Sequence, residues 1–210
     1  MSDEPKNAGM RLNSLLSAAF LDPLTAQQVA HFEEYLALIL RWNARVNLTA
    51  IRDEGGILSR HFVESIFCAR SLPAGIATLL DFGSGAGFPG LPIALCRPEI
   101  AVTLAESQGK KAAFLQEVVR SLGIPVDIHS GRAETLGVQF DCVTLRAVDK
   151  MELAVQAASK LVRPGGCLAL MTTNADLPSL QRLDLSGFSW RPNIHLPGGE
   201  DRIIALSELG

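Results

Sequence analysis

The sequence predicts an α/β fold: a mostly parallel sheet of seven strands with helices on both faces, preceded by a helical extension. Two observations carry this prediction. From residue 75 onward, short apolar runs alternate with segments of helical periodicity, as in doubly wound sheets. Before residue 75, apolar residues recur at helical spacing alone. We therefore expect a helical extension over residues 1–74 that packs on a sheet domain over residues 75–210.

The first part of the chain predicts three helices. The clearest covers residues 25–42, with Thr25 as a suitable N-cap. Shorter helices are expected at about 9–21 and at 55–70. Residues 42–53 follow neither a helical nor a strand period.

Five parallel strands and an antiparallel hairpin at the sheet edge are expected after residue 75. The hairpin lies within residues 188–208 and turns at Pro197-Gly198-Gly199. The parallel strands are expected at 77–82, 100–106, 124–130, 140–147 and 167–173.

Two of the connecting helices have recognisable ends. A helix over residues 110–123 ends at Gly123, which suits a left-handed C-terminal position. A second helix over residues 150–162 is expected to begin at Asp149 as its N-cap and to end at Pro164-Gly165-Gly166.

Composition indicates an ordinary soluble protein. The 210 residues are 48% hydrophobic and 20% charged, and they contain no apolar run long enough to span a membrane. The N-terminus lacks the basic and then apolar segments of a signal peptide, so we expect a cytoplasmic protein. We expect no metal site and no disulfide, because the cysteines form no CxxC pair and lie among apolar residues: Cys68, Cys96, Cys142 and Cys167.

Charge is unevenly distributed along the chain. The net charge of −3 makes the protein a poor non-specific binder of polyanions. Residues 41–70, however, carry five arginines against three acidic residues. A defined phosphate site in this stretch is compatible with the overall charge.

The turn after the first strand is the strongest sign of a ligand site. It runs Asp81-Phe82-Gly83-Ser84-Gly85-Ala86-Gly87-Phe88-Pro89-Gly90, at the strand ends where such sheets bind ligands. The glycines formally match the dinucleotide-binding pattern, and Glu106 lies where an acid would bind ribose hydroxyls. Glycines without Cβ atoms let the backbone approach a ligand closely.

Other features of this turn argue against a dinucleotide. Pro89 and Pro92 remove backbone donors where a pyrophosphate would need them, and Asp81 places a carboxylate in the phosphate path. A cationic adenosyl ligand without phosphates, S-adenosylmethionine, suits the turn better. Its sulfonium and ammonium groups would lie near Asp81, although Asp81 is also a residue that caps turns for local reasons.

Two further segments are expected at the same rim. The loop His129–Glu134 follows a strand and is placed to cover an adenine. Arg146 ends an otherwise apolar strand, which favours a site residue over a surface arginine.

From Trp42 to about Leu170 the chain resembles the bacterial family of 16S ribosomal RNA guanine-N7 methyltransferases, called RsmG or GidB. The matching residues follow the family's order and spacing: Trp42-Asn43-x-x-x-Asn47-Leu48-Thr49, Arg60-His61-Phe62-x-x-Ser65, the turn Asp81 to Gly90 with Pro92, Lys110-Lys111, Arg132-x-Glu134 and Arg146-Ala147.

The resemblance implies a class I, Rossmann-like methyltransferase that uses S-adenosylmethionine and methylates N7 of one guanine in the RNA of the small ribosomal subunit. It implies a positioning role for Arg146, between cofactor and target base. The implied cofactor-binding residues are Asp81, Gly83, Gly85, Gly87, Phe88, Glu106, Ala133, Glu134 and Arg146. The implied RNA-facing residues are Asn43, Asn47, Arg60, His61, Lys110 and Lys111. We expect a monomer that acts on the subunit or its assembly intermediate.

The chain departs from the family pattern at two places. Glu106 stands where the family usually has aspartate. After the fifth strand the family commonly has Lys-Gly, whereas this chain has Met171-Thr172-Thr173, so a cation is missing there. Three other readings stay open: a class I methyltransferase for a small molecule or a protein, a nicotinamide-dependent oxidoreductase, and a binding module without catalysis.

Overall fold

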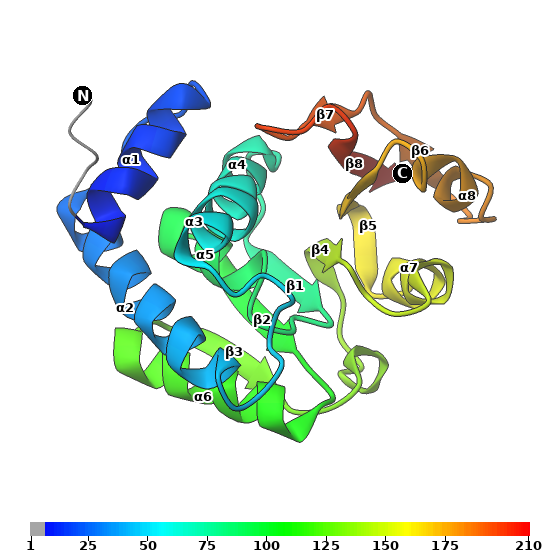
Figure 1. The fold of residues 1–210 in the computed structure, drawn as a ribbon. Coiled ribbons are helices and arrows are strands. Elements are labelled where there is room, and N and C mark those ends of the chain that lie inside the picture. Colours follow the sequence, from blue (N-terminus) through cyan, green and yellow to red (C-terminus); the bar gives the residue numbers. More distant parts are fainter. Residues whose placement is uncertain (1–6) are drawn as a thin grey trace.

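Eight strands form one mixed sheet in the computed structural model of the chain, which describes residues 7–210 (Figure 1). Their order is β3-β2-β1-β4-β5-β8-β6, with β7 also beside β8. The first five are parallel, and β8 runs antiparallel to its neighbours. The predicted class is confirmed. The strands are β1 (Thr78–Phe82), β2 (Ala101–Ala105), β3 (Val126–His129), β4 (Phe140–Arg146), β5 (Val162–Thr173), β6 (Phe188–Trp190), β7 (Ile194–His195) and β8 (Arg202–Leu209).

The edge strand beside β8 is broken into two pieces. β6 pairs with residues 207–209 of β8, and β7 pairs with residues 203–204, so eight strands fill seven positions. Pro192 lies between the two pieces and has no N–H with which to continue the ladder. The turn at 197–199 joins β7 to β8 as predicted, but the prediction of a single strand before this turn was wrong.

Helices cover both faces of the sheet (Figure 1). Successive strand residues point to opposite faces, so Leu79 packs with the first helical layer and Leu80 with the second. The second layer contains η2 (Ala133–Thr135, a 3-10 helix), α7 (Met151–Ser159) and α8 (Leu177–Gln181). The first contains α1 (Ala8–Ala18), α2 (Ala26–Asn43), α3 (Glu54–Gly56), η1 (Ile57–Val63, a π-helix), α4 (Glu64–Ser71), α5 (Gly90–Cys96) and α6 (Gly109–Leu122).

The helix predictions before the sheet are confirmed with one difference. Thr25 caps α2 in a capping box: its hydroxyl accepts the Gln28 N–H at 3.2 Å, and the Gln28 side chain accepts the Thr25 N–H at 3.0 Å. The segment expected as one helix over 55–70 is helical throughout, but residues 57–63 form a π-helix. Such segments are rare and occur frequently at functional sites.

The predicted boundaries between α7 and β5 were wrong. α7 ends at Ser159, and Lys150 with a φ of 52° stands at its N-cap, where no side chain caps the helix, so Asp149 is not the cap. Pro164 and Gly165 lie inside β5 instead of ending α7. The pairing of β4 with β5 shifts register at this point, and such an irregularity accommodates a proline in a strand.

The strand order reverses between β1 and β4. β2 and β3 follow β1 on one side of it, whereas β4 and β5 lie on the other. In open α/β sheets the loops that leave such neighbouring strands diverge to opposite faces and open a crevice at the carboxyl ends. The glycine turn after β1 and Arg146 at the end of β4 both lie at this point.

None of the helices within residues 7–210 combines the length and the apolar character needed to cross a lipid bilayer.

The capping box of α2 can be tested by replacing Thr25 with alanine. The change removes the acceptor for the Gln28 N–H, and we expect it to lower the free energy of unfolding by about 1 kcal/mol. Urea unfolding measures the loss. Ser14→Ala is the control, because the exposed Ser14 hydroxyl donates to a carbonyl within α1 and caps nothing; equal losses in both variants would contradict the role of the cap.

Candidate cofactor and substrate site

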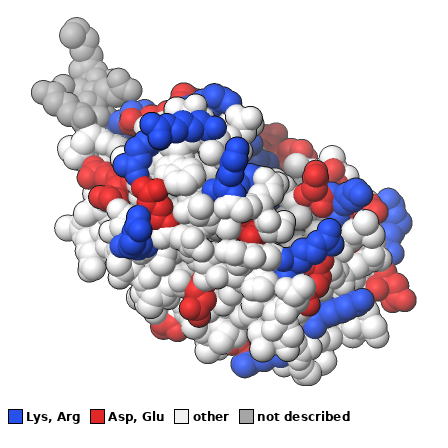
Figure 2. All heavy atoms as spheres, turned by 90° about the horizontal axis from the view of Figure 1, so that it is seen from below, with Lys and Arg blue, Asp and Glu red and all other residues white. Residues whose placement is uncertain are grey.

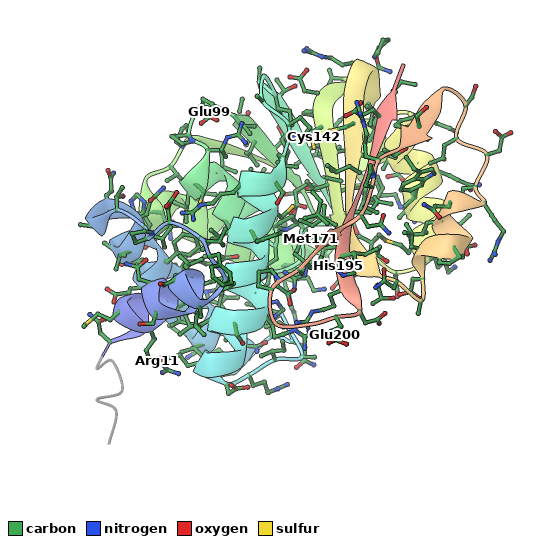
Figure 3. The ribbon with its side chains drawn as sticks, turned by 90° about the horizontal axis from the view of Figure 1, so that it is seen from above. Arg11, Glu99, Cys142, Met171, His195 and Glu200 are labelled. Atoms are coloured by element: carbon green, nitrogen blue, oxygen red, sulfur yellow. The ribbon has the colours of Figure 1, made fainter. Side chains whose placement is uncertain are left out.

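A cavity of about 1300 Å³ opens at the carboxyl ends of the central strands. In Figure 3, Cys142 marks the start of β4 and Met171 marks the end of the neighbouring strand β5. The cavity lies at the end of the sheet marked by Met171. Its wall combines segments that are far apart in the sequence. They are residues 48–51, Arg60, His61, Glu64, 83–86, Phe88, 106–108, Lys111, 146–153, 171–173, Asp176, Ser179, Leu180, Leu196 and Arg202.

The glycine turn and Glu106 form one end of the cavity. Gly83 and Gly85 line it with φ values of 72° and 58°, a backbone conformation that favours glycine. The Glu106 carboxylate accepts the Gly85 N–H at 2.9 Å and the Gln108 N–H at 2.7 Å. Each carboxylate oxygen keeps a second lone pair, so Glu106 can still accept hydroxyl groups of a ligand.

Gly87 serves packing instead of ligand contact. It does not line the cavity among residues 7–210, and its φ is 94°. A Cβ atom there would lie 2.4 Å from Leu91 and 2.8 Å from the Tyr35 hydroxyl. That hydroxyl, from α2, donates to the Ala86 carbonyl at 2.5 Å. The helical layer therefore holds the turn directly.

Asp81 binds the glycine turn from its buried side. Its carboxylate is buried, accepts the Thr144 hydroxyl at 2.8 Å and the Gly90 N–H at 3.2 Å, and does not line the cavity within the described chain. Burial raises the pKa of Asp81 to about 6, against the lowering effect of these hydrogen bonds. Of the two readings of Asp81, this geometry matches the one in which it caps the turn.

The backbone N–H groups in the first turn of α5 already have hydrogen-bond acceptors. Pro89 and Pro92 have no N–H, and the remaining N–H groups bond within the loop. Gly90 donates to Asp81, Leu91 to the Gly87 carbonyl and Ile93 to the Pro89 carbonyl. A pyrophosphate would find the usual helix N-terminal donors already used.

Arg146 lies in a cluster of three arginines around one buried carboxylate. Glu64, 1% exposed, lies 2.7 Å from Arg146 Nη2, 3.2 Å from Arg60 Nε and 2.8 Å from Arg202 Nε. Burial raises the pKa of Glu64, and the three arginines oppose that shift. This cluster forms the cationic end of the cavity.

His61 forms a wall beside the glycine turn. Its ring stacks on Phe88 with centroids 4.6 Å apart, and its Nε2 lies 2.6 Å from the Thr49 hydroxyl. Burial, with smaller effects from Arg146 and Arg60, lowers the pKa of His61 to about 3. The imidazole is therefore neutral at physiological pH.

Several predicted residues lie away from the cavity among residues 7–210. Ala133 is buried in the second helical layer, and Glu134 is exposed beside it. Asn43 is buried, and its side chain bonds to the backbone of residues 48–51, so it holds the loop after α2. Asn47 accepts a hydrogen bond from Arg52. Lys111 lines the cavity, whereas its neighbour Lys110 does not.

The structure adds residues for which the sequence predicted no role in the site. Tyr35 and Thr49 hold the turn and His61, and Glu64 and Arg202 complete the arginine cluster. Arg202 pairs in register with Thr173, in the segment where this chain lacks the Lys-Gly that the family commonly has after the fifth strand. The four-residue spacing of Arg60 and Glu64 on a helix was the one local signal of the cluster.

The chain matches the family model GidB, rRNA small subunit methyltransferase G, over residues 28–185. It is 45% identical over 150 residues to ribosomal RNA small subunit methyltransferase G of Roseiflexus sp. (strain RS-1), covering 68% of this chain and 64% of that protein. The chain therefore spans less than two thirds of that relative's length. It is 38% identical over 197 residues to the protein of the same name from Chloroflexus aggregans, covering 88% and 83%.

Solved structures support the fold. A methyltransferase from Pyrococcus furiosus superposes with a TM-score of 0.64 at 16% sequence identity, covering 89% of this chain and 100% of that one. At this level of identity the likeness confirms the Rossmann-like architecture alone.

Gly87 offers a test of how the turn is packed. In Gly87→Ala the new methyl group meets Leu91 and Tyr35, so we expect the turn to shift and the affinity for S-adenosylhomocysteine to fall by roughly 100-fold, measured by calorimetry. Gly75→Ala is the matched control, because Gly75 has a φ of 83° with open space around it. Equal affinities in the two variants would contradict the packing role.

Neutral His61 gives a pH-dependent stability. The unfolded chain binds a proton at this residue below pH 6.5 and the folded chain only near pH 3, so His61 lowers the free energy of unfolding as pH falls through this window. His61→Gln should reduce the loss between about pH 7.5 and about pH 5 by up to about 1.4 kcal/mol per pH unit, measured by urea unfolding. The exposed His195→Gln is the control, and an unchanged pH slope in His61→Gln would refute the assignment.

Proposed function

Because the chain belongs to the GidB family, rRNA small subunit methyltransferase G, we propose that it transfers a methyl group from S-adenosylmethionine to N7 of a specific guanine in 16S rRNA. The observation that carries the proposal is the polarity of the cavity. Glu106 follows β2, and Arg146 and Arg202 lie on β4 and β8, on the other side of β1. β1 lies between β2 and β4, and neighbouring strands are ~4.8 Å apart, so the strands from which the acidic and the cationic end arise are separated by ~10 Å.

The acidic end fits S-adenosylmethionine. Gly83 and Gly85 let the ligand approach the backbone, and Glu106 can accept the ribose hydroxyls. A pyrophosphate is disfavoured, because the first-turn donors of α5 are engaged and Asp81 lies buried beneath the turn. This argument favours the methyl donor over a nicotinamide dinucleotide on the same type of sheet.

The reaction needs little acid–base chemistry from the protein. S-adenosylmethionine supplies an electrophilic methyl group on a positively charged sulfur. Guanine N7 carries an in-plane lone pair and no proton, so no general base has to act. His61, whose pKa burial lowers to about 3, is a weak base, and its Nε2 lies 2.6 Å from the Thr49 hydroxyl, so His61 is unsuited to act as a general base. The protein contributes alignment of the two reactants and a wall that excludes water.

Arg146 is the candidate positioning residue for the target nucleotide. It lies at the end of β4 on the cavity wall, beside the glycine turn. Methylation makes the guanine base cationic, so Arg146 would bind a hydrogen-bond acceptor or a phosphate of the nucleotide and not N7 itself. The base has to leave its stack to reach this depth, as in other enzymes that modify bases.

The surface favours a structured RNA substrate over free polyanion. Lysine and arginine side chains are interspersed with acidic ones on the face shown in Figure 2, and the net charge is −3. Binding then depends on a few defined contacts, such as the half-exposed Arg60 and the rim residue Lys111. We propose that the substrate is the small subunit or an assembly intermediate, and that the chain acts in the cytoplasm as a monomer without a metal ion.

Transfer of labelled methyl groups tests the function. Small subunits from cells that lack this chain should accept label from S-adenosylmethionine, and nucleoside mass spectrometry should identify 7-methylguanosine in their 16S rRNA. Label that enters only small molecules or proteins would contradict the proposal, as would preferential binding of NAD over S-adenosylhomocysteine.

Lys111 tests the RNA contact. We expect Lys111→Ala to weaken binding to the small subunit and to lower the slope of log affinity against log salt by about 1, because one phosphate contact is lost. Filter binding at several salt concentrations measures the slope. Lys160→Ala serves as the control, since Lys160 is exposed and lies just before β5, at the opposite end of the sheet. The same slope in wild type and Lys111→Ala would rule out this contact.

A further inference from the structure

Glu64 is the point at which three distant segments of the chain meet. Its carboxylate lies within 3.2 Å of arginines from η1, β4 and β8, and it is 1% exposed. One oxygen faces Arg146, and the other faces Arg60 and Arg202. Three guanidinium groups this close would repel one another without a negative charge between them.

Arg146 is held at several points of the same helical segment. Its Nη2 donates to Glu64 at 2.7 Å and to the Arg60 carbonyl at 2.6 Å, and its Nη1 donates to the Ser65 hydroxyl at 3.2 Å. These acceptors lie where the π-helix η1 passes into α4. The guanidinium plane is therefore fixed before any substrate arrives.

The cluster keeps an excess of positive charge toward the cavity. Three arginines and one carboxylate leave a net charge of +2, and the side chains of Arg60, Arg202 and Arg146 are 47%, 20% and 13% exposed. Groups that are partly exposed on a cavity wall can bind hydrogen-bond acceptors of a ligand. Glu64 itself has no such exposure, so it acts through the arginines.

We infer that Glu64 is a positioning residue for methyl transfer: its carboxylate fixes the Arg146 guanidinium in the orientation that holds the target nucleotide against the methyl donor. This inference rests on the proposed function. It assigns Glu64 no contact with substrate or cofactor. Glu64 contributes by holding the Arg146 guanidinium in a fixed orientation, so this cation does not have to reorganise during the reaction.

The test combines Glu64→Gln with Arg146→Ala under single-turnover conditions, with isolated small subunits and saturating S-adenosylmethionine. Glu64→Gln removes the charge while keeping the side-chain volume, and we expect the transfer rate to fall by roughly 100-fold. In the Arg146→Ala background the same change should alter the rate by less than about threefold, because residues that act as a unit are not additive. Glu64→Asp keeps the charge and should recover part of the rate.

Asp141→Asn is the matched control. Asp141 is a buried carboxylate that pairs with Arg163 and accepts the Ala77 and Thr78 N–H groups, at the opposite end of the sheet. Its loss should lower the free energy of unfolding while the transfer rate of the folded protein stays within about threefold of wild type. Urea unfolding of all variants establishes that the rates refer to folded protein. If Glu64→Gln does not fold, the double variant Glu64→Gln/Arg146→Ala is measured in its place, because it contains neither the Glu64 carboxylate nor the Arg146 guanidinium.

Distinct results separate the two proposals. An equal fold-loss from Glu64→Gln in both backgrounds, or a Glu64→Gln rate within about threefold of wild type, would overturn the role of Glu64 and leave the proposed function standing. If Glu64→Gln does not fold, a Glu64→Asp rate equal to wild type together with a double variant slower than Arg146→Ala would overturn it. A wild-type chain that methylates no guanine in any small subunit would overturn both.

Discussion

The reversal of strand order at β1 decides where the chemistry of this molecule is placed. The chain leaves β1 and β4 in different directions, so a crevice opens between their carboxyl ends. The glycine turn enters it from β1, Glu106 from β2, Arg146 from β4 and Arg202 from β8. The acidic and cationic ends of the cavity follow from these strand positions. In a sheet of simple sequential order, β2 and β3 would lie between β1 and β4, and Arg146 would not lie beside the glycine turn.

Three buried carboxylates near the carboxyl ends of the strands are stabilised in three different ways, because an unpaired buried charge is costly. Glu106 accepts two backbone N–H groups and keeps lone pairs for a ligand. Glu64 neutralises part of an arginine cluster. Asp81 has a hydroxyl and one N–H as partners, and burial raises its pKa to about 6. The three carboxylates therefore differ in how far their partners neutralise their charge, and each has a different role in the site.

Most features governed by local physics were predictable from the sequence, and features governed by distant contacts were not. The Thr25 cap, the end of α6 at Gly123 and the glycine turn each depend on a few neighbouring residues, and all three were found. Asp149, expected as an N-cap by the same local rule, was wrong, because Lys150 with a φ of 52° stands at the N-cap of α7. Pro164 was misplaced because the register shift that accommodates it depends on β4, more than twenty residues away. Glu64 and Arg202 are 138 positions apart in the sequence, and only the folded sheet brings them to one carboxylate–guanidinium pair.

The helical layer before the sheet is part of the site and not an attachment to it. The Tyr35 hydroxyl bonds to the turn at Ala86, and Thr49 holds the His61 ring that stacks on Phe88. The same layer shares one apolar cluster with β1, β2 and α6. The glycine turn is therefore positioned by side chains from the helical layer as well as by the strands of the sheet.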